Sequence, residues 1–251
     1  MSKVEEYKEA LRELEDWDSF LLEESGLPGP RGNIELGRAV AEEGDEELFR
    51  RYLEYDEGRA PTNSPTEFLA FCGVLGLGRL LAEGRGDLLP LLRTCASDGR
   101  WRVREAVAMA LQRWGLADMR ALLHEMEAWS GGNLLERRAA ASALCEPALL
   151  SDRSHAREVL RLLDGMTASI AEIQDRRNDE FTALRKGLGY CWSVTVVALP
   201  EEGKRLMEKW FSNDDRDVLW IMKENLRKKR LERMDPEWVR KWQAQLGMGR
   251  E

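Results

Sequence analysis

The chain has 251 residues, of which 43% are hydrophobic and 33% are charged, and its formal net charge is −8. This composition is ordinary for a helical globular protein. No apolar run approaches the roughly 18 residues that a membrane span needs, and the first residues do not form a signal peptide. We therefore expect no membrane partner and a cytoplasmic location.

The negative charge is concentrated at the N-terminus. Residues 1–60 contain 18 acidic and 8 basic residues, whereas the rest of the chain contains 28 acidic and 30 basic residues. We therefore divide the chain into an acidic N-terminal helical cap, residues 1–60, and one continuous domain, residues 61–251. The overall sign disfavours nucleic acid as a partner, although a local basic groove remains compatible with it.

Residues 3–24 have apolar side chains at helical spacing and predict one acidic helix. A Pro/Gly-rich stretch, residues 26–32, ends it. A helix pair over 33–41 and 45–55 follows, with Asp45 as N-cap. The remaining helices are expected over 67–82, 87–96, 100–114, 117–129, 134–144, 152–174, 181–198, 201–211, 215–230 and 236–246. The last of these begins at Asp235-Pro236, where the N–H that proline lacks would be unbonded in any case, and we interpret this helix as a terminal cap.

Three blocks in this series share a pattern at a period of 33 residues. They begin at Ser64, Ser97 and Ser130, and each has a small polar start, turn-forming residues and then a large apolar residue. The polar starts predict N-caps, because a serine oxygen can accept a backbone N–H of the first helical turn. A repeat of this length is typical of stacked helix pairs.

These blocks resemble HEAT-type repeats. Asp98, Val103 and Arg104 match the family pattern in full, Asp179 and Arg185 match with Leu184 in place of Val, and Arg137 and Val218 match singly. The resemblance covers roughly residues 60–232. It implies an all-α fold, namely a right-handed α-solenoid of antiparallel helix pairs, armadillo-like in general form. It also implies that the Asp and Arg residues make internal ladder contacts between repeats.

Second helices line the concave face of such solenoids, which is their usual binding surface. The residues expected there are Arg102, Met109, Arg113, Arg138, Lys186, Tyr190, Asp217 and Trp220. Tyr190 and Trp220 are either exposed interface anchors or aromatics turned into the core by the superhelical twist. The arginines either hold an acidic peptide or phosphates, or form a solvated charged face.

The densest basic patch is residues 223–230, which contain five Lys or Arg side chains. Cations at a helix C-terminus are favoured by the helix dipole, and the alternative is contact with a phosphate or an acidic partner. Asn225 within this patch is expected to close the last repeat and not to take part in chemistry. Gly76 and Gly78 are expected to permit close helix packing.

No catalytic constellation is recognisable. His124 and His155 are the only histidines and lack metal-binding spacing, and the four cysteines are expected to be buried free thiols. We therefore expect no metal, no cofactor and a non-enzymatic scaffold that binds a protein or peptide through its concave face. The alternative is a DNA-binding protein or an alkyl-base DNA glycosylase of the HEAT-like type, for which Trp101, Tyr190, Trp220 and Asp217 would be ingredients.

Overall fold

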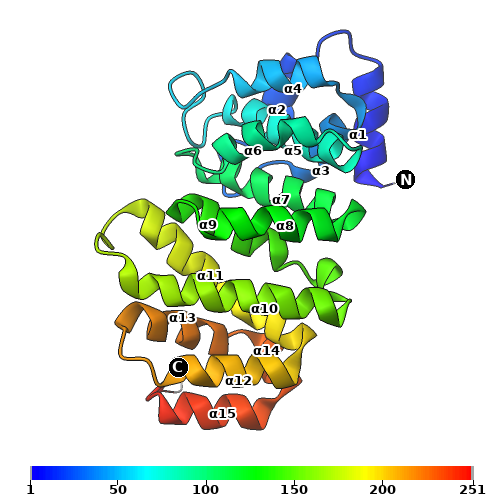
Figure 1. Cartoon of the computed structure of the whole chain (residues 1–251). Helices are drawn as coiled ribbons and strands as arrows, with labels where there is room; N and C mark the ends of the chain where they lie inside the picture. The colour runs from blue at the N-terminus through cyan, green and yellow to red at the C-terminus, as the bar shows by residue number, and fades with distance from the viewer. Residues whose placement is uncertain (1, 250–251) are drawn as a thin grey trace. The chain divides into compact units, whose positions relative to one another are not determined.

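The computed structural model describes residues 2–249, and within this range every regular element is helical (Figure 1). There are fifteen α-helices and three short 3₁₀-helices over these residues. The expected all-α class is therefore confirmed. The chain divides into two compact units, unit 1 (Met1–Asp118) and unit 2 (Met119–Glu251), which are described separately. The boundary expected at residue 60 falls inside unit 1.

Unit 1 is organised around one buried helix, α5 (Glu67–Ala82). Helices α3, α4 and α7 all pack against α5, and α1 packs against α3. Fourteen of the sixteen residues of α5 are buried, so this helix is enclosed on nearly every side. The acidic segment 1–60 is thus part of the packing of unit 1. The other elements of the unit are α1 (Lys3–Arg12), α2 (Asp18–Glu24), α3 (Ile34–Glu43), α4 (Glu46–Leu53), η1 (Gly86–Leu88), α6 (Leu89–Cys95) and α7 (Trp101–Ala117).

Two glycines of α5 allow its neighbours to approach closely, as expected. A Cβ added at Gly78 would lie 2.4 Å from the Cα of Ala110 on α7, and a Cβ at Gly76 would lie 2.3 Å from the ring of Phe49 on α4. Neither distance is compatible with a side chain. Close packing of helices in unit 1 therefore depends on these two positions lacking one.

Unit 2 contains two layers of helices. Helices α9, α11 and α13 pack side by side in one layer, and α8, α10 and α12 form the other. Each helix of one layer packs on its sequence neighbour in the other layer, which buries Trp129, Phe181 and Trp192 between them. The elements are α8 (Met119–Ser130), α9 (Leu134–Leu144), η2 (Pro147–Leu150), α10 (Arg153–Ala168), η3 (Ser169–Glu172), α11 (Asp179–Ala198), α12 (Pro200–Phe211), α13 (Arg216–Leu226), α14 (Lys229–Met234) and α15 (Pro236–Gln245).

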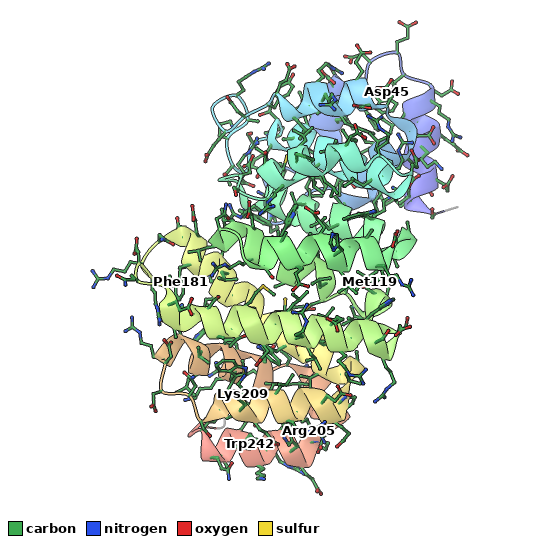
Figure 2. The ribbon with its side chains drawn as sticks, viewed as in Figure 1. Asp45, Met119, Phe181, Arg205, Lys209 and Trp242 are labelled. Atoms are coloured by element: carbon green, nitrogen blue, oxygen red, sulfur yellow. The ribbon has the colours of Figure 1, made fainter. Side chains whose placement is uncertain are left out.

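The last helix covers one end of unit 2. Helix α15 packs on α13 and α14, and its Trp242 ring lies 4.6 Å from the ring of Phe211 at the end of α12. Figure 2 labels Trp242 on α15 beside α12, which carries Lys209. Asp235 accepts the N–H of Trp238 at 3.0 Å. Asp235 is therefore the N-cap of this helix.

Two long helices expected from the sequence are each divided. The segment 3–24 forms α1 and α2, because the chain turns after Arg12 and the indole Nε1 of Trp17 donates to the carbonyl of Leu11 at 2.9 Å. The segment 215–230 forms α13 and α14. The break lets both Leu226 and Leu231 be fully buried, although a turn separates them.

Ser97 and Ser130 are not the N-caps of the helices that follow them, whereas the hydroxyl of Ser64 accepts the backbone N–H of Glu67, the first residue of α5, at 3.3 Å. The N-cap residue of α7 is Arg100, whose side chain makes no capping bond, and α9 is capped by Asn133 in a capping box with Glu136. Ser130 is the last residue of α8. Asp45, in contrast, accepts the N–H of Leu48 at 2.8 Å as expected. The period nevertheless survives in the helix starts, at Glu67, Trp101 and Leu134.

Candidate functional site

Three of the eight residues expected on a binding surface lie in unit 1, and one of them is internal. Arg102 is 5% exposed, forms an ion pair with Glu67 at 3.0 Å and donates to the side chain of Asn63 and the carbonyl of Gly29. Its guanidinium therefore joins α7 to α5 and to the loop after α2, out of reach of a ligand.

The other two are half-buried on α7. Met109 and Arg113 are both partly exposed, and Arg113 forms an ion pair with Glu42 of α3 at 2.7 Å. The charge of Arg113 is thus compensated within unit 1. Nothing about these two positions distinguishes a binding surface.

Asp217 in unit 2 is also internal. It is 3% exposed, and its carboxylate accepts from Arg185 of α11 at 2.6 Å and from Arg176, in the segment before α11, at 3.1 Å. Hydrogen bonds to Asp215 and Asp217 raise the pKa of Arg176 above its usual value, although desolvation by burial opposes the rise. No sequence pattern indicated Arg176, because this residue lies outside the repeat blocks.

Of the residues for which the family resemblance implies ladder contacts, Arg185 makes one between two helices, whereas Asp98 and Arg104 bond within the turn before α7. Glu67–Arg102 joins α5 to α7, and Asp217–Arg185 joins α13 to α11. The carboxylate of Asp98 instead binds Arg100 within the same turn, at 2.7 Å. Arg104 donates to the carbonyls of Asp98 and Gly99, which fastens the turn before α7.

Asn225 closes the packing of α13 on α11, as expected. It is fully buried and accepts the backbone N–H of Ser193 at 2.8 Å. Its amide donates to the carbonyls of Leu188 and Ile221, both at 2.8 Å. Every polar atom of the amide has a partner from the two helices, which leaves it no role at the surface.

Four expected surface residues do come together in unit 2. Lys186 and Tyr190 are one turn apart on the outer side of α11, and both are exposed. On one side of them lies Arg138 of α9, whose Cγ is 3.4 Å from where a Cβ at Gly187 would be. On the other side lies Trp220 of α13, whose ring is 3.1 Å from where a Cβ at Gly189 would be.

Tyr190 is the centre of this surface and is 46% exposed. The guanidinium of Arg230, on α14, lies 4.5 Å from the centre of the Tyr190 ring, and the ammonium of Lys228 lies 5.8 Å from it. Arg230 also donates to the Tyr190 hydroxyl. Trp220 is half-buried beneath the guanidinium of Arg185 at 4.4 Å. We call the surface made by Arg138, Lys186, Tyr190, Trp220, Lys228 and Arg230 the Tyr190 face.

The Tyr190 face carries positive charge without a matching carboxylate. Lys186, Lys228 and Arg230 make no ion pair with any residue between 2 and 249. The nearby Glu224 is paired with Arg227, and Asp217 is already bound by its two arginines. An anionic partner therefore meets three cations and an aromatic ring there.

Comparison with known proteins finds no family model, curated protein or solved structure that matches this chain. The residues 2–249 also contain no group of His, Cys, Asp and Glu side chains placed to hold a metal ion. No helix in that range is long and apolar enough to cross a bilayer.

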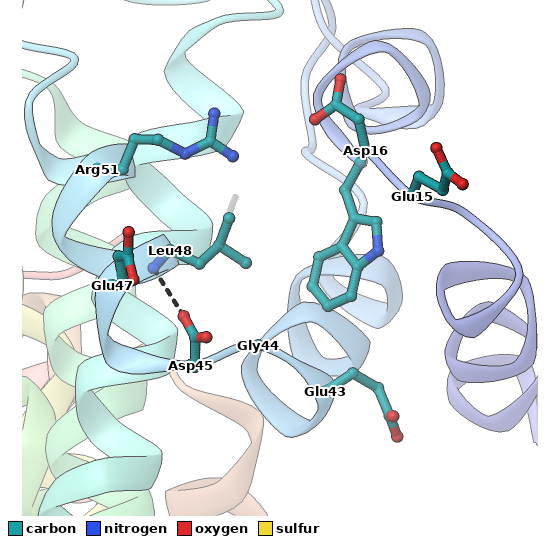
Figure 3. A pocket seen from close by; sticks show the side chains of 9 residues that line it. Glu15, Asp16, Glu43, Gly44, Asp45, Glu47, Leu48 and Arg51 are labelled. Carbon is teal, nitrogen blue, oxygen red and sulfur yellow. Dashed lines mark hydrogen bonds between the residues drawn. The ribbon is translucent and has the colours of Figure 1, made fainter.

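A cavity in unit 1 was not anticipated from the sequence. It has a volume of about 320 Å³ and lies between the segment after α1 and the start of α4 (Figure 3). The residues that line it are Glu15, Asp16, Trp17, Glu43, Gly44, Asp45, Glu47, Leu48 and Arg51. The sequence does contain two acidic turns 28 residues apart, one at Glu15 and one at Glu43. Nothing in the local sequence indicates that these two turns line the same cavity.

Proposed function

We propose that this protein is a non-enzymatic helical-repeat scaffold of HEAT-like architecture, which binds an acidic segment of a protein partner on the Tyr190 face. The observation that carries the proposal is an exposed tyrosine ring within 6 Å of two cations, Lys228 and Arg230, that no carboxylate of the described chain neutralises. Arginine and tyrosine are the residue types that contribute most to protein interfaces.

The solenoid form of the proposal is supported by the two-layer packing of consecutive helices in unit 2 and by the repeated helix starts. The cytoplasmic location is supported by the four cysteines, which are all free thiols. Neither feature identifies the partner. The positive charge of the Tyr190 face indicates that the partner is acidic.

A protein segment is favoured over duplex DNA by the small extent of the positive surface. Unit 2 as a whole carries 22 acidic and 23 basic residues, so the uncompensated cations form a local cluster and not a continuous track. The glycosylase alternative would need an accessible carboxylate, and Asp217 is buried between two arginines. Binding of an acidic peptide therefore explains the features of the Tyr190 face better than DNA binding or base excision does.

The test is a fluorescence polarisation titration of the full chain with three labelled probes. Two are twelve-residue peptides: one contains six Glu or Asp residues and two Leu, and the other has Gln in place of the acids. The third is a duplex DNA with the same label. We expect the acidic probe to bind, and Tyr190→Ala and Lys228→Glu/Arg230→Glu each to weaken it at least about tenfold.

The matched control is Arg120→Glu/Arg240→Glu, which reverses two exposed charges of unit 2 elsewhere. Equal weakening by the control and by Lys228→Glu/Arg230→Glu would contradict the assignment, because it would show dependence on net charge alone. Duplex DNA that binds more tightly than the acidic probe, with a steep loss of affinity as salt rises, would overturn the proposal in favour of nucleic acid.

A further inference from the structure

The cavity of unit 1 has walls of two chemical kinds. Trp17 and Leu48 are half-buried and supply an aromatic and an aliphatic surface. Figure 3 shows Leu48 and Arg51, both on α4, facing the segment that carries Glu15 and Asp16. The Nε1 of Trp17 is engaged by the carbonyl of Leu11 at 2.9 Å, which holds the indole in a fixed orientation. The cavity thus contains a preorganised apolar slot.

The charges around this slot are not balanced. Arg51 lines the cavity, but both of its terminal nitrogens bind Asp18, at 2.8 and 3.1 Å. Glu43 is bound by Arg12 at 2.6 and 2.7 Å, and this bond holds the pKa of Glu43 below its usual value. Four of the lining carboxylates make no ion pair with any residue in the described range 2–249: Glu15, Asp16, Asp45 and Glu47.

The kind of cation that fits follows from the geometry. The carboxylates do not converge as metal ligands do, since residues 2–249 contain no group placed to hold an ion. They share the wall of the cavity with an indole and a leucine side chain instead. A flat organic cation on an aliphatic stem matches both walls, because a guanidinium stacks on an aromatic face while its donors reach carboxylates.

We propose that this cavity binds an arginine side chain presented by a protein partner. The stem lies along Leu48, the guanidinium stacks on Trp17, and the carboxylates of Asp16 and Glu47 accept its N–H groups. The volume of about 320 Å³ is large enough for one such side chain. This site lies in unit 1 and does not depend on the function proposed for the Tyr190 face.

The test uses the full chain labelled with ¹⁵N and records two reporters, the indole N–H of Trp17 and the backbone N–H of Gly44. The probes are the capped tripeptides Gly-Arg-Gly, Gly-Lys-Gly and Gly-citrulline-Gly, together with calcium chloride. Citrulline has the shape of arginine without its charge. We expect saturable shifts with the arginine peptide, and affinity at least about tenfold lower for the citrulline peptide.

Two variants locate the binding. Asp16→Asn/Glu47→Gln removes two uncompensated charges, and Trp17→Leu, read at Gly44, removes the aromatic wall; each is expected to weaken the arginine peptide at least about fivefold. The matched control, Glu23→Gln/Glu54→Gln, removes two exposed charges of unit 1 outside the cavity. It is expected to leave the affinity within about twofold.

Several results would overturn the inference. If the citrulline peptide bound as tightly as the arginine peptide, the charge would play no part in binding. If the lysine peptide bound as tightly, the guanidinium group would play no specific part. Calcium-induced shifts of the same size would identify a metal ion as the occupant. Equal weakening by the control variant, or shifts that never saturate, would show non-specific attraction to the acidic unit.

Discussion

Both units are built from packed helices, but they differ in the balance of their charges. Unit 1 contains 24 acidic and 15 basic residues, whereas unit 2 is nearly balanced. In unit 1 a group of carboxylates with no ion pair within residues 2–249 lines a cavity, and in unit 2 a group of such cations lies around Tyr190. The comparison shows that helix packing determines the positions of side chains, while the side chains that remain outside the core determine what each unit can bind.

Both units join central helices by an ion pair with a buried carboxylate, and unit 2 adds a link of a second kind. In unit 1 a buried charged pair, Glu67–Arg102, links α5 to α7 at 3.0 Å. In unit 2 a buried neutral amide, Asn225, links α13 to α11 with two hydrogen bonds, in addition to the Asp217–Arg185 ion pair between the same helices. Removing one partner of a buried charged pair leaves an uncompensated charge in the core. We therefore expect loss of the Glu67–Arg102 link to lower the free energy of unfolding more than loss of the Asn225 link.

The largest effect is expected from Glu67→Ala. It leaves the buried guanidinium of Arg102 without its carboxylate and should lower the free energy of unfolding by about 3–5 kcal/mol. Urea unfolding measures the loss, and hydrogen exchange should place it in α5 and α7 of unit 1.

The control for this prediction is Glu127→Ala, which breaks an exposed ion pair with Arg161 and should cost less than about 1 kcal/mol. The double variant Glu67→Leu/Arg102→Met should recover most of the stability, because neither charge then remains buried. Similar losses for Glu67→Ala and Glu127→Ala would show that the buried pair has no special weight.

A smaller effect is expected from Asn225→Ala. It leaves the N–H of Ser193 and the carbonyl of Leu188 without this partner and should cost about 2–3 kcal/mol. Hydrogen exchange should accelerate in α11 and α13 and remain unchanged in unit 1. The control is Asn213→Ala, which removes one bond to the N–H of Asp215 in a half-buried turn. If Asn225→Ala cost more than Glu67→Ala, our ordering of the two links would be wrong.

The smallest effect is a pH dependence in unit 2. Hydrogen bonds from Arg176 and from two backbone N–H groups lower the pKa of Asp215 below its ordinary 3.8, although desolvation by burial opposes this. Because the folded-state pKa is the lower one, the stabilisation is present above about pH 4 and is lost as the pH falls through the folded-state value.

The measurement is the difference in urea midpoint between the wild type and Asp215→Asn, taken from pH 7 down to pH 3. We expect a modest difference at pH 7, about 1 kcal/mol or less, that shrinks below pH 4. Asp214→Asn, a change at the exposed neighbouring carboxylate, serves as control and should show a smaller pH-dependent difference. A difference that grows on acidification would contradict the sign.

Most of the helices could be predicted from the sequence alone, because their apolar periodicity and their breakers are local. The segments 67–82 and 134–144 were predicted with the observed bounds. The divisions after Arg12 and Leu226 were not, since each depends on which buried site the following residues reach. Amphipathic spacing continues across both breaks and gives no sign of a change in direction.

The binding surface was predictable in part. Periodicity placed Lys186, Tyr190 and Trp220 on one row, because residues at equivalent positions of packed helices are neighbours. It also placed Arg102 and Asp217 there, and both are internal. A sequence shows that a residue is charged, but it does not show which opposite charge that residue contacts. The partner of Asp217 is 32 residues away and that of Arg102 is 35 residues away, each in a neighbouring helix.

What the sequence determined by itself is the helical class, the period of the helix starts and the concentration of acid near the N-terminus. Only the tertiary structure decided which charges are compensated. The meeting of Trp17 with Leu48, and of Tyr190 with Arg230, depends on how helices distant in sequence pack. Local propensity does not encode such contacts, because burial and charge pairing are properties of the assembled core.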